Sequence, residues 1–297
     1  MLRYGPGAFD LMLVNPRLVS MMLAMLPLAL AAQNLLATAA PVKPGELRET
    51  TAGHARGMTC LIKAYPDLVK EILDSNHLRT HSGDVLAYDQ GLPQSSHEWR
   101  LDHADLKAQF DQPYPAQPLT AAPELNMDPG RLRSQAFFDH LYGQNLKQVQ
   151  SQMVSLHWAP CQCKLSFAGR HGAAQALLRV GQQLARQPEL AAYVAKPLGS
   201  LNWRNIAGTQ RRSMHAYGAA IDFQLPKHLH HYWQWSGCKA GARCDYPAPV
   251  LRDQTLQAVV QVFEAHGFIW GGKWYHFDTL HFEYRPELTG PACAGLR

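Results

Sequence analysis

Two histidines and two aspartates have the spacing that most clearly suggests chemistry in this chain. His215 and Asp222 occur in the run S-x-H-x-x-G-x-A-x-D, and Asp278 and His281 occur further along in D-x-x-H-F-E. Two imidazoles and one carboxylate supply three protein ligands to zinc and leave the fourth position open for water. Catalytic zinc sites have this arrangement, whereas structural sites fill all four positions. The pattern therefore indicates a metallohydrolase.

The segments that carry these residues are expected to be strands. Residues 219–225 alternate so that Asp222 points away from its apolar neighbours. Residues 280–284 alternate in the same way, with His281 and Glu283 on the face opposite the apolar side chains. Two such strands would form a platform that presents ligands on one face and contributes to a core on the other.

Both motifs together resemble those of the zinc D-alanyl-D-alanine peptidases. This family includes VanY-like carboxypeptidases and L-alanyl-D-glutamate endopeptidases, which trim bacterial peptidoglycan. The resemblance implies that Asp278 is the general base and that Arg204, in the run N-W-R, polarises the scissile carbonyl; Arg211 and Arg212 are alternatives for that arginine. The zinc ligands that it implies are His215, Asp222 and His281.

The resemblance extends over most of the chain beyond its N-terminal segment, and it implies an α+β fold of the hedgehog type found in zinc DD-peptidases. In this fold, helices pack on a small, mainly antiparallel sheet. The further segments that carry the resemblance are 128–131, 137–138, 142–143, 206–209 and 267–274.

Several residues near the motifs are candidates for substrate binding. Ser213 and Tyr217 could bond to the substrate or to the ligands, and Trp274 could form a wall of the pocket, although ordinary packing explains each equally well. Arg212 or Arg211 offers a guanidinium for a terminal carboxylate, with a solvated surface pair as the alternative. Glu283 is a candidate to hold a ligand imidazole in place.

The expected reaction is zinc-assisted hydrolysis of peptidoglycan stem peptides next to a D-residue, with removal of terminal D-alanine favoured. L-alanyl-D-glutamate cleavage is the alternative within the same chemistry. Two further alternatives are a non-catalytic, zinc-bearing protein that binds the cell wall and a structural envelope protein whose histidines and aspartates only stabilise the fold. The expected partners are therefore peptidoglycan peptides.

Residues 1–39 are expected to be a signal peptide. Arg17 precedes about fifteen residues with almost no polarity, which is short for a membrane span, and small residues at 29–31 or 37–39 offer cleavage sites. An uncleaved anchor or a buried helix is the alternative. The mature protein is then expected to be periplasmic or secreted, with no stable membrane insertion after cleavage.

The composition of the chain allows an ordinary core and does not favour nucleic-acid binding. Of all residues, 46% are hydrophobic, which is enough for an ordinary core. The net charge of +5 is diffuse and contains no Lys/Arg runs, so nucleic acid is not an expected partner, whereas a mildly basic surface suits an anionic cell wall.

Six cysteines in an exported chain favour disulfides. Cys238 and Cys244 bracket a short loop and are the first expected pair. A metal site at Cys161, Cys163 and His157 is disfavoured because no partner pair lies at zinc-finger spacing. The partners of the remaining cysteines are left open.

Three regions are expected after the signal peptide: a helical and loop-rich extension at 40–160, a catalytic domain at 161–290 and a tail at 291–297. Periodicity predicts a broken helix in 60–73, loops in 92–126 and a strand at 164–167. Further helices are predicted within 131–152, 171–194 and 255–266.

Other histidines are interpreted as outside the metal site. The cluster His228, His230 and His231 follows a proline among aromatic residues, and His266 lies at a predicted helix end. His276 could replace His281 as a ligand, but the D-x-x-H spacing favours His281.

Overall fold

The computed structural model of the protein describes residues 44–93, 95–239, 241–291 and 293. The described residues form one compact unit. The expected signal peptide at 1–39 lies outside the described residues, as does most of the expected tail at 291–297. No helix within the described part of the chain is both long and apolar enough to cross a membrane.

A four-stranded antiparallel sheet lies at the centre of the fold, with the strand order β6-β7-β9-β8. Its middle strands are β7 (Ala220–Phe223) and β9 (His281–Tyr284), in register so that Asp222 lies opposite His281. The edge strands are β6 (Pro197–Gly199) and β8 (Phe268–Trp270). Both predicted strands are therefore present, and neighbouring strands bring their polar residues together.

One helix, α8 (Gln254–Ala265), packs against strand β8 of this sheet. This helix is capped by the Asp253 carboxylate, which accepts from the Leu256 N–H at 2.7 Å. Phe263 of α8 stacks on Phe282 of β9 with ring centres 4.0 Å apart. The arrangement of helices and antiparallel strands confirms the α+β class.

A hairpin of β4 (Met153–Trp158) and β5 (Cys163–Ala168) forms a second sheet beside α5 (Ala173–Leu184). Trp158 is fully buried and donates its indole N–H to the carbonyl of Val194 at 2.8 Å. The predicted strand at 164–167 lies within β5.

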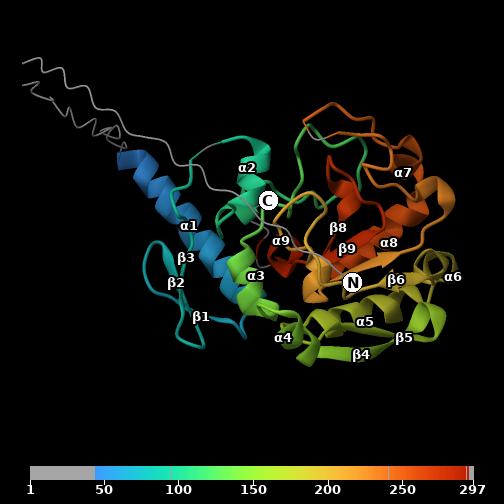
Figure 1. The fold of residues 1–297 in the computed structure, drawn as a ribbon, viewed down its shortest axis with the longest axis horizontal. Coiled ribbons are helices and arrows are strands. Elements are labelled where there is room, and N and C mark those ends of the chain that lie inside the picture. The colour runs from blue at the N-terminus through green and yellow to red at the C-terminus, as the bar shows by residue number, and fades with distance from the viewer. Residues whose placement is uncertain (1–43, 94, 240, 292, 294–297) are drawn as a thin grey trace, which may run out of the picture. The chain divides into compact units, whose positions relative to one another are not determined.

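The N-terminal part of the described chain contains α1 (Pro44–Ala64) and a three-stranded sheet. The predicted break at Pro66 is confirmed, since α1 ends at Ala64, but the helical prediction beyond it was wrong because the chain there forms β1 (Val69–Ile72). This strand pairs with β2 (His77–Thr80), and the third strand, β3, is Val85–Ala87. Figure 1 shows the small sheet beside α1.

The segment between this sheet and the hairpin consists mainly of loops and short helices, as predicted for 92–126. The α-helices in it and in the following region are α2 (His97–Asp102), α3 (Gln135–Tyr142) and α4 (Leu146–Ser151). The other short helices are α6 (Pro188–Ala191), α7 (Ala248–Arg252) and α9 (Pro286–Thr289).

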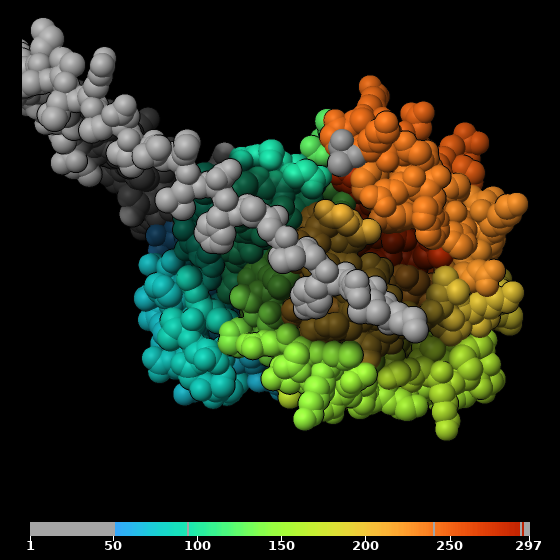
Figure 2. All heavy atoms as spheres, viewed as in Figure 1, coloured from blue at the N-terminus to red at the C-terminus, as the bar shows by residue number. Residues whose placement is uncertain are grey.

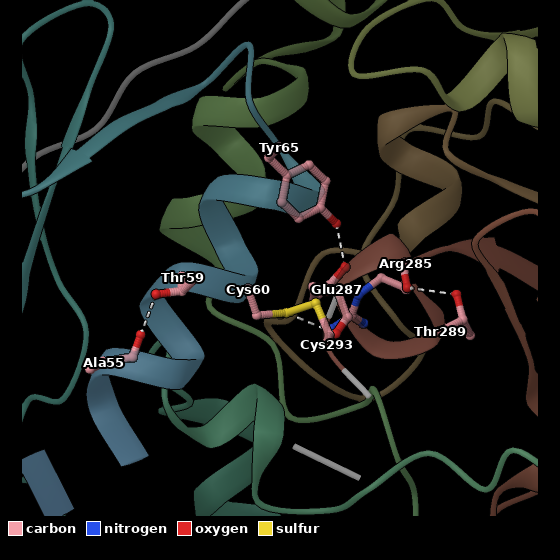
Figure 3. Close-up of a disulfide and its surroundings, with 8 residues drawn as sticks. All are labelled: Ala55, Thr59, Cys60, Tyr65, Arg285, Glu287, Thr289 and Cys293. Carbon is pink, nitrogen blue, oxygen red and sulfur yellow. Dashed lines mark hydrogen bonds and ion pairs between the residues drawn. A yellow bond between two sulfur atoms is a disulfide. The ribbon is translucent and has the colours of Figure 1, made fainter. Parts of the chain in front are cut away.

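A disulfide and a buried ionic network join α1 to the C-terminal segment. Figure 3 shows Cys60 of α1 bonded to Cys293, across 233 positions of sequence. Beside this bond, the Tyr65 hydroxyl donates to Glu287 of α9 at 2.5 Å, and Glu287 accepts from the Arg285 Nε at 2.5 Å. The expected Cys238–Cys244 pair is present, and the third pair is Cys161–Cys163.

Candidate metal centre

A short turn positions the first of the metal motifs. The 3₁₀ helix at Met214–Tyr217 starts at Ser213, whose hydroxyl accepts from the His215 N–H at 3.3 Å. The turn ends at Gly218, with φ of 64°, where a Cβ would also collide with the sulfur of Met153. Glycine therefore allows the chain to reverse here and enter β7, which carries Asp222.

Three ligand atoms converge where this turn meets the central strands. The Nε2 of His215, the Oδ1 of Asp222 and the Nδ1 of His281 lie 3.1 Å from one another in all three pairs. Tetrahedral zinc with bonds of about 2.0–2.1 Å separates its ligand atoms by about 3.3 Å. The triangle therefore has nearly the dimensions that zinc requires.

The proton positions on the two imidazoles also favour a cation. The Nδ1 of His215 faces the carbonyl of Ser200 at 3.0 Å, and the Nε2 of His281 faces a carboxylate oxygen of Glu283 at 3.0 Å. Both partners only accept hydrogen bonds, so these two nitrogens carry protons. In neutral rings the converging atoms are then three lone pairs, which repel unless a cation or a proton lies among them.

Buried charges behind the centre fix the orientation of His281. Burial by itself would raise the pKa of Glu283, but Arg133, His281 and Arg285 lower it to about 2. Glu283 is therefore ionised, and it accepts from the Arg285 Nη1 at 3.0 Å. Outer carboxylates of this kind set the tautomer of a ligating histidine and increase its basicity.

Asp278 lies in the same cavity as the three ligands. Burial raises its pKa to about 6; the nearby His281 opposes this shift, and the negative charge of Asp222 adds to it. A carboxylate with this pKa is well matched to a proton-transfer role near neutral pH.

The cavity itself has a volume of about 350 Å³ and opens between the metal motifs and the segment around Trp233. In Figure 2 the red atoms of the C-terminal region are recessed between yellow and orange surfaces. Arg204 is exposed on the cavity wall, and Ser213 and Trp274 also line it. The structure thus brings together most of the residues chosen from the sequence.

Two residues chosen as substrate contacts point elsewhere. Tyr217 is fully buried and donates to Asp139 of α3 at 2.7 Å. Arg212 forms an ion pair with the same carboxylate, and its guanidinium lies 4.4 Å from the Trp203 ring. Neither contributes to the wall of the cavity that contains the metal ligands.

Several further residues line this cavity without having been chosen as site residues from the sequence, among them Arg131, Arg133, Tyr232 and His276. Arg131 belonged to a segment of the resemblance, and His276 was considered only as a replacement ligand. His276 lies instead against Asp128, with its Nδ1 2.6 Å from the Oδ2. Only the tertiary structure brings these residues together.

Among the residues that the structure describes, two groups have metal-compatible geometry: His215 with Asp222 and His281, and a second group of His97, Asp128 and His276. The cluster at 228–231 is in neither. His266 instead contacts the Gln183 side chain at 3.0 Å.

Residues 207–284 match the family model described as D-alanyl-D-alanine carboxypeptidase. This segment includes all three converging ligands together with Asp278. No curated protein and no solved structure matches the chain. The family resemblance inferred from the motifs is therefore confirmed over these residues.

Proposed function

Because residues 207–284 carry the sequence of the D-alanyl-D-alanine carboxypeptidase family, we propose that the protein is a zinc peptidase that trims peptidoglycan stem peptides. The specific reaction proposed is removal of the terminal D-alanine. Cleavage between L-alanine and D-glutamate is the competing reaction, since the same metal chemistry serves both.

The convergence of three candidate ligand atoms in one cavity is the observation that carries this proposal. His215, Asp222 and His281 fit zinc in ligand type and spacing, and buried or backbone acceptors orient both imidazoles. When bound there, zinc supplies a Lewis acid that polarises the substrate carbonyl and lowers the pKa of water.

The surrounding residues have distinct roles in the proposed reaction. Asp278 accepts the proton of the attacking water and later returns it to the leaving amine. Arg204 on the cavity wall donates to the carbonyl oxygen as negative charge develops there. The Trp274 ring lies beside His281, tilted by 44° with ring centres 5.5 Å apart, and limits access of bulk water on that side.

The fold and location are proposed on the same basis. The hedgehog-type arrangement is supported by the family match together with the central antiparallel sheet. A periplasmic or secreted location is supported by the three disulfides among the described residues, since disulfides persist in oxidising compartments.

Digestion of purified peptidoglycan fragments tests the proposal. Zinc-loaded protein is incubated with pentapeptide-containing muropeptides, and the products are weighed by mass spectrometry. Loss of one alanine, abolished by a chelator, is the expected result. Release of the peptide beyond L-alanine would instead establish the endopeptidase reaction, and unchanged muropeptides would favour a wall-binding protein without catalysis.

A further inference from the structure

A second histidine in the cavity is held by a fully buried carboxylate. Asp128 accepts from the backbone N–H of His276 at 2.9 Å and from its Nδ1 at 2.6 Å. The same carboxylate accepts from the Nε2 of His97 at 2.9 Å. The loop that carries Asp128 therefore fixes both the position and the tautomer of His276.

The other ring nitrogen of His276 has no partner among the described residues. Because the Nδ1 donates to a carboxylate, the Nε2 is the atom left for another ligand. This Nε2 is buried and makes no hydrogen bond, and the side chain is only 3% exposed. His276 nevertheless lines the cavity that contains the metal ligands.

Arg131 offers a second unused group in the same cavity. Its Nη1 is buried and makes no hydrogen bond among the described residues, although it lies 3.4 Å from the Oδ2 of Asp128. The guanidinium is also 5.8 Å from the centre of the Trp274 ring. Asp128 thus anchors two groups, each of which has a nitrogen still available for a ligand.

The neighbouring aromatic rings restrict the movement of His276. His97 stacks on it in a nearly parallel orientation at 5.8 Å, and Trp233 packs edge-on at 4.8 Å. A buried imidazole that cannot turn away keeps its Nε2 available to whatever enters the cavity.

The available nitrogens of His276 and Arg131 are suited to binding an anion, and the cluster around Asp128 is not suited to a second metal ion. His97, Asp128 and His276 have metal-compatible spacing, but their nitrogen-to-oxygen distances of 2.6 and 2.9 Å are those of hydrogen bonds. The guanidinium of Arg131 beside the shared oxygen would also repel a cation. A negatively charged group is therefore the chemically appropriate ligand.

We propose that the Nε2 of His276 and the Nη1 of Arg131 bind the free C-terminal carboxylate of the substrate peptide. This inference rests on the proposed function and explains how a peptidase at this site would select chain ends. In this complex the imidazole of His276 donates to Asp128 through Nδ1 and to the substrate through Nε2. Arg131 supplies the second charge-assisted hydrogen bond.

Two matched substrates test this subsite in the zinc-loaded full chain. One is a peptide that ends in D-alanyl-D-alanine, and the other is the same peptide with a C-terminal amide. Two charge-assisted bonds predict a kcat/KM for the acid at least about 100-fold above that for the amide. His276→Gln and Arg131→Gln should each reduce this ratio about 10-fold or more, while Arg131→Lys restores part of it.

Arg204→Gln is the matched control, because it removes a guanidinium from the same cavity at a different place. It should lower turnover of acid and amide by the same factor and leave their ratio unchanged. Thermal unfolding of each variant verifies that it is folded. Equal hydrolysis of acid and amide by the wild type would overturn the carboxylate subsite while leaving the peptidase intact.

A binding measurement separates the subsite from the peptidase activity. N-acetyl-D-alanine, which offers a single carboxylate, is titrated into zinc-free protein labelled with ¹⁵N at histidine. The resonance of the His276 Nε2 should shift in the wild type, and Arg131→Gln should need about 10-fold more ligand or more for the same shift. If the His276 resonance shifts but the zinc-loaded protein hydrolyses no peptide, the subsite is upheld and the proposed function is rejected. If the His276 resonance does not shift in the wild type, the subsite is rejected.

Discussion

Two carboxylates contact the imidazole of His281, one on each side of the ring. Asp222 faces the Nδ1 and Glu283 faces the Nε2, at 3.1 and 3.0 Å. Burial by itself would lower the pKa of His281, but the hydrogen bonds to these carboxylates raise it to about 10. In the metal-free protein, a proton therefore occupies the position where zinc would bind.

Zinc binding should consequently release about one proton per chain at pH 6.5. Because the pKa of His281 is raised, the proton competes at every pH below about 10, and the apparent zinc affinity should increase with pH in this range. Calorimetric titration of zinc into the metal-free protein, repeated in buffers that differ in ionisation enthalpy, measures the number of protons released. Binding without proton release would show that the imidazole is already neutral. His228→Gln, which is outside the cavity, should behave as the wild type.

Replacing Asp278 and replacing His281 should affect zinc binding and turnover differently. Asp278→Asn should keep zinc and lose turnover by about 10² to 10⁴-fold, because it removes the proposed general base and leaves all three proposed ligands in place. His281→Ala should lose the metal itself. Metal analysis and rate measurements on both variants decide the assignment. If Asp278→Asn binds no zinc while His281→Ala still binds zinc and remains active, the assignment of base and ligand is wrong.

Strand β9 connects the metal centre to the buried charges behind it. His281 and Glu283 share one face of the strand, and Arg285, at its end, donates to both Glu283 and Glu287. Arg285 is completely buried, and the surrounding carboxylates raise its pKa against the opposing effect of burial. The strand therefore carries a candidate metal ligand and the carboxylate that orients it, and Arg285 at its end, together with Arg133, keeps that carboxylate ionised.

Replacing Glu283 tests this connection. Glu283→Gln should weaken zinc binding by about 10 to 100-fold, because a neutral amide orients His281 less strongly and makes it less basic. Competition with a chromophoric chelator measures the zinc affinity. Glu98→Gln, at an exposed position in α2, is the control and should bind zinc as the wild type does. An unchanged affinity in Glu283→Gln would show that Glu283 does not support the ligand.

The sequence predicted the central elements well because their periodicity is strong. Alternation located β7 and β9, and apolar residues at helical spacing located α5 and α8. Strand β1 was mistaken for helix, since four residues are too few for alternation to be distinctive. The contact between Asp128 and His276 spans 148 positions and depends on tertiary packing, which local patterns do not contain.

At the scale of the whole molecule, the Cys60–Cys293 bond ties the first described helix to the C-terminal segment. It closes a loop across 233 positions of sequence, whereas Cys161–Cys163 spans only two. In the chain-entropy account, a longer closed loop restricts the unfolded chain more strongly. The two disulfides should therefore differ in their contribution to stability.

The double variant Cys60→Ser with Cys293→Ser should lower the free energy of unfolding by about 2–5 kcal/mol. Cys161→Ser with Cys163→Ser is the matched control, and it should lower the free energy of unfolding by less. Denaturant unfolding without reductant measures both. An equal loss in the two double variants would argue against stabilisation through loop closure.

We propose that one zinc ion bound by His215, Asp222 and His281 makes this protein a peptidase. The most direct measurement is a zinc titration of chelator-treated protein, followed by release of D-alanine from a peptide that ends in D-alanyl-D-alanine. We predict no release without metal, a linear rise as zinc is added, and a plateau at one zinc per chain. Full activity in the metal-free protein, or a zinc-loaded protein that cleaves no stem peptide, would contradict the claim.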